Sequence, residues 1–255
     1  MDAAAFSAFT ADLADRAQAD DRVIGLVVVG STAELDYAPD EWSDHDFLLI
    51  SRPGEQEGLR QHLGWLPAHE RILFSFRETA HGLKVFYDDG HMIEFAVFDL
   101  DEIALAGLNR YRVLFDRGGV EDACAERRNN PKPEQSDDHV FGMVISSSLV
   151  AIGRGRRGEV LSAAFLVTWA LTYLTRLIAR VVPAENSSVL DNLDSLRRFE
   201  HAYPSLAAEL AEAVRLSPPE GAFHLLEVLE RELRPLRPDL AWDAFDAVAA
   251  RVQRP

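Results

Sequence analysis

The chain has 255 residues, of which 47% are hydrophobic and 27% charged, and its formal net charge is −16. This length and composition are those of a globular protein with a sizeable core, built as one large domain or two modest ones. The acidity argues against non-specific binding to nucleic acid or to an anionic membrane, because both require a basic surface. It is compatible with a cationic small substrate, although acidity also favours solubility alone.

The sequence carries no sign of export or of a membrane anchor. A single cysteine, Cys124, excludes an intrachain disulfide. The first residues are acidic and amphipathic, which is not the pattern of a signal peptide. No apolar run reaches the roughly 18 residues of a membrane span, because Ser, Thr and Arg interrupt the most apolar stretch, residues 160–182. We therefore expect a cytoplasmic protein without a membrane partner.

The first half of the chain predicts a mixed β-sheet domain with flanking helices, of the α/β (α+β) class. Apolar residues at helical spacing over residues 2–19 predict a helix before the first strand. Short apolar runs predict strands at 23–29, 45–51, 72–78, 83–87, 92–98 and 111–115, with helices at 55–65 and 100–106. Asp89-Gly90 predicts a tight turn, so the strands on either side of it should pair as a hairpin.

The second half predicts an α-helical bundle. Two prolines and a polar cluster at residues 127–133 indicate a linker. Beyond it, segments that end at prolines predict helices at 140–152, 159–182, 191–201, 205–216, 220–234 and 240–252. We therefore expect two domains, residues 1–126 and 134–255.

Two neighbouring strands carry the residues that indicate a functional site. The first predicted strand ends in Gly30-Ser31, and Asp44-His45-Asp46 leads into the second. Residues two apart on a strand share a face, so Asp44 and Asp46 point the same way and His45 points into the core. Neighbouring carboxylates repel each other, and Mg²⁺ is a common compensating cation. Gly30 lets backbone N–H groups approach a phosphate, and Ser31 adds a hydroxyl donor.

A Gly-Ser turn, about a dozen intervening residues and Asp-x-Asp entering an apolar strand resembles the polymerase-β-type nucleotidyltransferase superfamily. Within it, the chain is most similar to the small enzymes that modify aminoglycoside or lincosamide antibiotics. These enzymes add a third carboxylate on a later strand, and Glu94 in His-Met-Ile-Glu-Phe-Ala-Val-Phe matches it. The resemblance implies that Asp44, Asp46 and Glu94 hold two Mg²⁺ ions and that Gly30 and Ser31 bind ATP.

The resemblance extends into the helical half, which would hold the acceptor. Arg157-Gly158-Glu159 is similar to the opening of the helical domain in these enzymes. Glu159 is either an acid stabilised at a helix start or the general base for the acceptor hydroxyl, and Glu94 is the other candidate for that proton. Arg77 and Lys84 lie on predicted strands, where they reach either the triphosphate or solvent.

The resemblance implies a Mg²⁺-dependent nucleotidyltransferase that moves AMP from ATP to a hydroxyl of a small cationic acceptor, with antibiotic resistance as its role. The alternative is a regulatory enzyme of the toxin–antitoxin type, which modifies a protein or RNA partner. The nucleases coupled to such enzymes carry Arg, four to six residues and then His. Here Arg197 and His201 are separated by three residues, which disfavours that alternative. The acceptor's identity and the oligomeric state stay open.

Overall fold

The computed structural model describes residues 1–33, 38–130, 134–190 and 194–252. The chain divides into two compact units, Met1–Lys132 and Pro133–Pro255. The first contains a mixed sheet with flanking helices, and the described part of the second contains helices and no strand. The predicted fold class is thereby confirmed.

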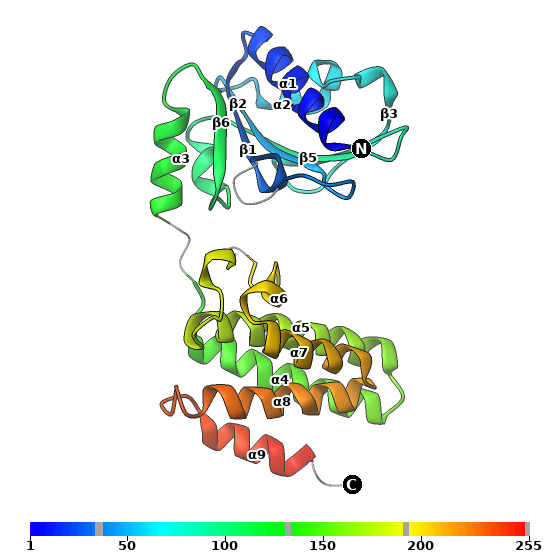
Figure 1. Cartoon of the computed structure of the whole chain (residues 1–255), viewed down its shortest axis with the longest axis vertical. Coiled ribbons are helices and arrows are strands. Elements are labelled where there is room, and N and C mark those ends of the chain that lie inside the picture. The colour runs from blue at the N-terminus through cyan, green and yellow to red at the C-terminus, as the bar shows by residue number, and fades with distance from the viewer. Residues whose placement is uncertain (34–37, 131–133, 191–193, 253–255) are drawn as a thin grey trace. The chain divides into compact units, whose positions relative to one another are not determined.

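The sheet of the first unit has the strand order β3-β4-β5-β2-β1-β6 (Figure 1). Its strands are β1 (Val23–Val29), β2 (His45–Ser51), β3 (Ile72–Arg77), β4 (Gly82–Tyr87), β5 (Met92–Phe98) and β6 (Tyr111–Asp116). β2 and β5 run parallel, whereas the other neighbouring strands are antiparallel. β4 and β5 form the predicted hairpin, and Gly90 takes the positive φ of 82° that its turn requires.

The two faces of the sheet are covered unequally. One face packs against α1 (Ala3–Ala19) and α2 (Gln56–Gln61), which bury Leu13, Leu59 and strand residues such as Phe47. On the other face, α3 (Val120–Asn129) and the 3₁₀ turn η4 (Glu102–Leu105) form a smaller core. The side chains of β3 and β4 on this second face are exposed or half-buried. The site described below lies on this less covered face.

Helix α3 was not predicted, and part of it was assigned to the linker. It runs to Asn129, past residue 126, where the sequence places the end of the domain. The helix buries only Val120 and Cys124 and is otherwise mostly charged, so its apolar pattern is too weak to detect. Arg127 is anchored by donating to the carbonyl oxygen of Ala106 at 2.7 Å. The rest of the predicted linker includes residues 131–133, which lie outside the described residues.

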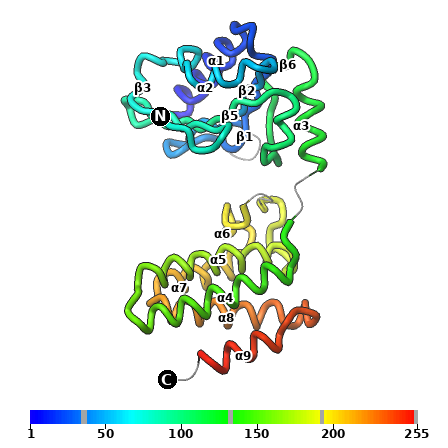
Figure 2. Tube along the Cα trace, turned by 180° about the vertical axis from the view of Figure 1, so that it is seen from behind, coloured from blue at the N-terminus to red at the C-terminus, as the bar shows by residue number. Residues whose placement is uncertain are grey.

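The second unit contains α4 (Asp137–Arg156), α5 (Val160–Val181), α6 (Phe199–Ala202), α7 (Pro204–Arg215), α8 (Pro218–Leu233) and α9 (Trp242–Val252). α4 and α5 lie side by side, and both contact α8 (Figure 2). The helix predicted over 191–201 is shorter than expected: residues 191–193 are not described, and the left-handed Arg198, with φ of 59°, precedes a four-residue helix. A capping box of Ser217 and Glu220 begins α8.

Helix α5 is long and apolar enough to cross a membrane by length and composition, contrary to the expectation from the sequence. The most apolar 18-residue window of this helix has a mean hydropathy of 1.5, because its Ser and Thr residues lower the hydropathy only slightly. Core helices of soluble proteins meet the same criterion. In this structure 39% of that window is buried, and Ala170, Leu174 and Leu177 belong to the core of the second unit.

Candidate active site

Asp44, Asp46 and Glu94 lie together on the less covered face of the sheet. Asp46 and Glu94 are register partners on the parallel strands β2 and β5, and such partners present their side chains to the same face. Asp44 lies two residues before Asp46, so it returns to the same side. One oxygen from each carboxylate lies within 4.8 Å of the other two, and all three residues are half-buried. Strand pairing therefore brings together the three acids predicted from the sequence.

This donor set fits a hard divalent cation. All three side chains offer carboxylate oxygens, which Mg²⁺ prefers at about 2.0–2.1 Å. Ligand oxygens across such an ion are therefore about 4 Å apart, a spacing that small side-chain rotations reach from the one observed. Asp44, Asp46 and Glu94 are thus the residues of the described chain that could hold a metal.

Gly30 provides the space that the carboxylate of Asp46 occupies. It has a φ of 57°, a left-handed conformation that favours glycine. A Cβ atom at this position would lie only 2.8 Å from Oδ2 of Asp46. Glycine is therefore favoured here by its backbone conformation, and a Cβ at this position would move the Asp46 carboxylate.

The hydroxyl groups that follow Gly30 fix the backbone of the two aspartates. The buried Ser31 donates from Oγ to the carbonyl oxygen of Asp44 at 3.2 Å. The buried Thr32 accepts at Oγ1 from the backbone N–H of Asp46 at 3.0 Å. In this structure the hydroxyl of Ser31 therefore donates its hydrogen bond to the backbone. The sequence had suggested that it donates to a phosphate.

Two supporting residues were missed in the sequence. Thr32 directly follows the Gly-Ser pair, so a second hydroxyl was a visible signal. Arg112 of β6 donates to the carbonyl oxygens of Ala33 at 3.1 Å and Thr32 at 3.2 Å, which holds the 3₁₀ turn η1 (Gly30–Ala33) against the sheet. Its sequence separation from Thr32 is 80 residues, and no local pattern marks it.

Lys84 is ion-paired with the third carboxylate. It is the register partner of Glu94, with Nζ 3.2 Å from Oε2 of Glu94 and 2.8 Å from Oε1 of Glu78. These hydrogen bonds, from Glu78 first and Glu94 second, raise the pKa of Lys84. The sequence left two roles open for Lys84, reaching the triphosphate or facing solvent. In this structure its ammonium group partly balances the negative charge of Glu94.

His45 belongs to the core, as its position between the aspartates predicts. Its Nδ1 lies 2.9 Å from Nε2 of His91, and its Nε2 lies 3.0 Å from the hydroxyl of Thr10 on α1. Burial, assisted by the neighbouring His91, lowers the pKa of His45 to about 3. Burial also lowers the pKa of His91. A neutral pair of imidazoles therefore links α1 to the strands that carry the carboxylates.

Glu159 lies in the second unit and is not a member of the three-carboxylate group. It is exposed at the start of α5, where Nε of Arg157 donates to it at 2.8 Å and Nε of Arg154 lies 3.8 Å away. The hydrogen bond from Arg157, with the charges of both arginines, lowers the pKa of Glu159. Its carboxylate is thus ionised at neutral pH, as a general base must be, but is a weaker proton acceptor than a free glutamate.

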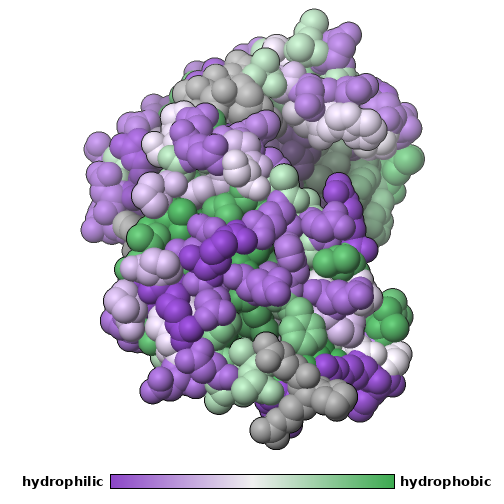
Figure 3. Space-filling view, turned by 60° about the horizontal axis from the view of Figure 1, so that its bottom comes forward, coloured by the Kyte–Doolittle hydropathy of each residue, from purple (hydrophilic) through white to green (hydrophobic). Residues whose placement is uncertain are grey.

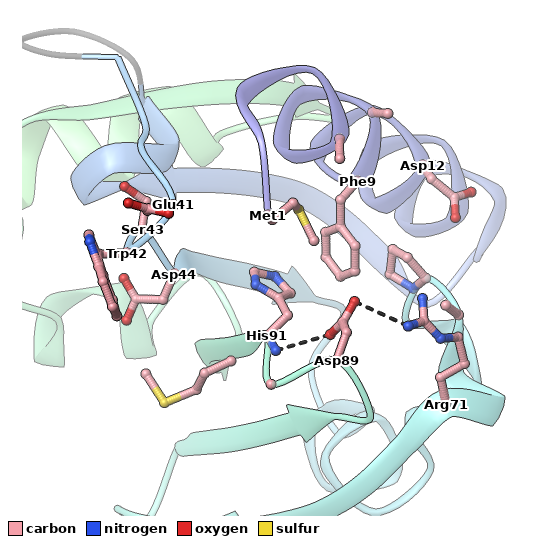
Figure 4. A pocket seen from close by; sticks show the side chains of 16 residues that line it. Met1, Phe9, Asp12, Glu41, Trp42, Ser43, Asp44, Arg71, Asp89 and His91 are labelled. Carbon is pink, nitrogen blue, oxygen red and sulfur yellow. Dashed lines mark hydrogen bonds and ion pairs between the residues drawn. The ribbon is translucent and has the colours of Figure 1, made fainter.

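A cavity of about 780 Å³ opens beside Asp44, between α1, residues 41–44 and the β4–β5 turn (Figure 4). The carboxylates that line it are those of Asp12, Glu41, Asp44 and Asp89. Its one lining arginine, Arg71, is already paired with Asp88 at 2.6 Å and Asp89 at 3.1 Å. The indole of Trp42, 87% exposed, stands at the same cavity. This lining suits a cationic ligand.

No family model and no curated protein matches the chain. Two of the solved structures that align with the chain are those of an adenyltransferase and of a nucleotidyltransferase-like protein. One is an aminoglycoside 6-adenyltransferase from Bacillus subtilis, with a TM-score of 0.38 and 10% identity over 96% of each chain. The other is a nucleotidyltransferase-like protein from Exiguobacterium sibiricum, with a TM-score of 0.33 and 17% identity over 87% of this chain and 74% of that one. Similarity at this level carries no argument about activity.

Proposed function

We propose that the protein is a Mg²⁺-dependent nucleotidyltransferase that transfers AMP from ATP to a hydroxyl of a small cationic acceptor, such as an aminoglycoside-like antibiotic, in the cytoplasm. The observation that carries the proposal is the grouping of the Asp44, Asp46 and Glu94 oxygens within 4.8 Å of one another. Gly30-Ser31 borders this group, with the position of a Gly30 Cβ 2.8 Å from Asp46.

The proposed reaction follows from what these residues offer. Two divalent ions held by Asp44, Asp46 and Glu94 would supply the positive charge that phosphoryl transfer needs at the attacking and leaving oxygens. The backbone N–H groups of η1 bind the triphosphate, and Ser31 holds the backbone of Asp44 beside it, or turns its hydroxyl to a phosphate oxygen when ATP is bound. The acceptor hydroxyl oxygen forms a bond to the α-phosphorus while the bond from that phosphorus to the β-bridging oxygen breaks, and pyrophosphate leaves. The hydroxyl proton passes to a carboxylate, that of Glu94 or Glu159.

The acidic cavity supports a cationic acceptor. It places the carboxylates of Asp12, Glu41 and Asp89 beside Asp44, and the exposed Trp42 offers a cation–π surface. Attraction between such exposed charges is screened beyond about 8 Å at physiological ionic strength. The affinity for the acceptor should therefore fall as salt is added.

The test is to incubate the protein with each nucleoside triphosphate, Mg²⁺ and a panel of aminated hydroxyl compounds, and to measure product masses. The expected product is an acceptor heavier by one nucleoside monophosphate, formed with ATP and with release of pyrophosphate. A variant with Asp44→Asn and Asp46→Asn is the inactive control. Nucleotide found on a co-incubated protein or RNA, with every small acceptor unmodified, would favour the regulatory alternative.

A further inference from the structure

An aromatic cluster adjoins the three carboxylates on the less covered face of the sheet. Two rows of register partners cross this face from β5 to β3: Glu94, Lys84 and Phe76 in one row, and Met92, Phe86 and Phe74 in the next. Partners in register present their side chains to the same face. The rings of Phe74, Phe76 and Phe86, called the aromatic platform below, therefore share a surface with Glu94.

The three rings form a continuous apolar area in which neighbouring rings are stacked. The ring centroids of Phe74 and Phe76 are 5.7 Å apart and those of Phe74 and Phe86 are 6.3 Å apart, with planes inclined by 25° in both pairs. Phe74 is 57% exposed and Phe76 is 39% exposed. Exposed apolar patches with polar surroundings are typical of binding surfaces, whereas single exposed apolar residues need no explanation.

Leu73, on the same strand, is an exposed apolar residue that is not part of the aromatic platform. It is 73% exposed and lies on the edge strand β3 between Ile72 and Phe74, where the pairing with β4 shifts register. A substitution of Leu73 therefore provides a matched control for substitutions in the platform, because it changes an exposed apolar residue of the same edge strand.

The platform and the proposed triphosphate site lie on opposite sides of the strands that carry the carboxylates. Gly30-Ser31, the proposed triphosphate site, follows β1, whereas the platform lies on β3 and β4, on the other side of β2 and β5. Neighbouring strands are about 4.8 Å apart, so Phe76 lies about 10 Å from Glu94, which is the length of a small molecule. The aliphatic stem of Lys84 lies between them and continues the apolar surface.

We infer that the aromatic platform binds a flat apolar group of the acceptor while the acceptor's hydroxyl lies at Glu94. This inference rests on the proposed function and narrows its substrate class. The acceptor is amphipathic: it carries an amine for the acidic surroundings of Asp44 and a flat apolar group about 10 Å, or two strand spacings, from the hydroxyl that is modified.

The test uses two probes that differ only in a flat group, the methyl and 2-naphthyl glycosides of 2-amino-2-deoxyglucose. Binding is measured by calorimetry with Mg²⁺ and a non-hydrolysable ATP analogue, and transfer from ATP is measured separately. Wild-type protein should bind the naphthyl glycoside about tenfold more tightly than the methyl glycoside, as expected for stacking on aromatic side chains. The double variant Phe74→Thr, Phe76→Thr should lose this preference and keep the KM for ATP, while Leu73→Thr should behave as wild type.

The possible outcomes test the aromatic platform separately from the proposed nucleotidyl transfer. Equal affinities for the two glycosides in wild type, or an unchanged preference in the double variant, overturn the platform and leave nucleotidyl transfer standing. A rise in the KM for ATP in the double variant assigns the rings to the nucleotide and overturns the inference. A fall in melting temperature of more than about 4 °C, absent in Leu73→Thr, identifies the rings as packing surface and also overturns it. If the wild-type protein binds the naphthyl glycoside more tightly but transfers no nucleotide to any acceptor, the proposed function is contradicted.

Discussion

The carboxylate of Asp46 lies against the position that a side chain at residue 30 would occupy. The positive φ of Gly30 alone would cost another residue roughly 1–2 kcal/mol. The close approach of Asp46 adds a functional cost, because any Cβ at position 30 would displace the carboxylate. At the scale of single residues, the position of the Asp46 carboxylate therefore depends on the absence of a Cβ atom at residue 30.

Gly30→Ala should lower the free energy of unfolding by about 1–2 kcal/mol and abolish the rise in melting temperature caused by Mg²⁺ with ATP. The matched control is Gly54→Ala, since Gly54 has a φ of 88° and nothing within 4 Å of its Cβ position. The control should lose stability but keep the ligand-dependent rise, as measured by thermal unfolding. A Gly30→Ala protein that responds to ligand like the control would contradict the expectation that the Asp46 carboxylate must keep its present position.

The double change Asp44→Asn, Asp46→Asn should remove the response to Mg²⁺ and ATP without unfolding the protein. A ligand at 100 times its Kd stabilises the folded state by about 2.7 kcal/mol, and this gain should vanish in the variant. The ligand-free variant should still unfold in one cooperative transition. Thermal unfolding with and without ligand measures both effects, with Asp101→Asn on the surface as control. An unchanged ligand response would locate the nucleotide elsewhere.

At the scale of elements, buried histidines join α1 to the strands that carry the carboxylates. His45 on β2 contacts Thr10 on α1 and His91 next to β5, and all three side chains are buried. Because burial lowers the pKa of His45 to about 3, the unfolded chain binds a proton that the folded chain does not between pH 6.5 and about 3. The stability contributed by neutral His45 is therefore present above pH 6.5 and is lost as the pH falls.

Lowering the pH from 7 to 5 should reduce the free energy of unfolding, with a slope that approaches about 1.4 kcal/mol per pH unit for His45. His91 adds to this slope, because its pKa is also lowered. His45→Gln should flatten the dependence, whereas His62→Gln, an exposed position, should not. Chemical denaturation at several pH values measures it. Identical slopes in the two variants would contradict the assignment of the acid sensitivity to His45.

At the scale of the whole molecule, the chain combines an α/β unit that carries the carboxylates with a helical unit that carries Glu159. Hydrophilic side chains predominate on the face shown in Figure 3, with separate hydrophobic patches between them. Together with the net charge of −16, this surface favours association with cations. The proposed acceptor site and its salt dependence are consistent with that charge.

Glu159→Gln should lower the turnover by about a hundredfold and leave the KM for ATP unchanged, if Glu159 accepts the proton of the acceptor. The matched control is Glu212→Gln, because Glu212 is likewise exposed and paired with an arginine, Arg215 at 3.5 Å. Steady-state kinetics with both substrates distinguish the two variants. Wild-type turnover in Glu159→Gln would leave Glu94 as the proton acceptor.

The sequence alone predicted the strands β1, β2 and β5 with their bounds, since each is a short apolar run ended by a polar or glycine-containing segment. It also predicted that Asp44 and Asp46 share a face and that His45 lies in the core, because the alternation of side chains is a local property of a strand. It missed α3, whose two buried residues give no clear periodicity. It predicted helix 191–201, of which the described residues are helical only from Phe199, because Arg198 takes a left-handed conformation.

Only the tertiary structure decided which distant residues meet. The parallel pairing of β2 with β5 brings Glu94 beside Asp46, and the pairing of β5 with β4 and of β4 with β3 brings Lys84 and the aromatic platform beside Glu94. The supports of the site from Thr32 and Arg112, and the acidic cavity beside Asp44, arise in the same way. The β4–β5 hairpin is marked by its local Asp89-Gly90 turn, whereas the order and register of the other strands result from the packing of the whole sheet against its helices.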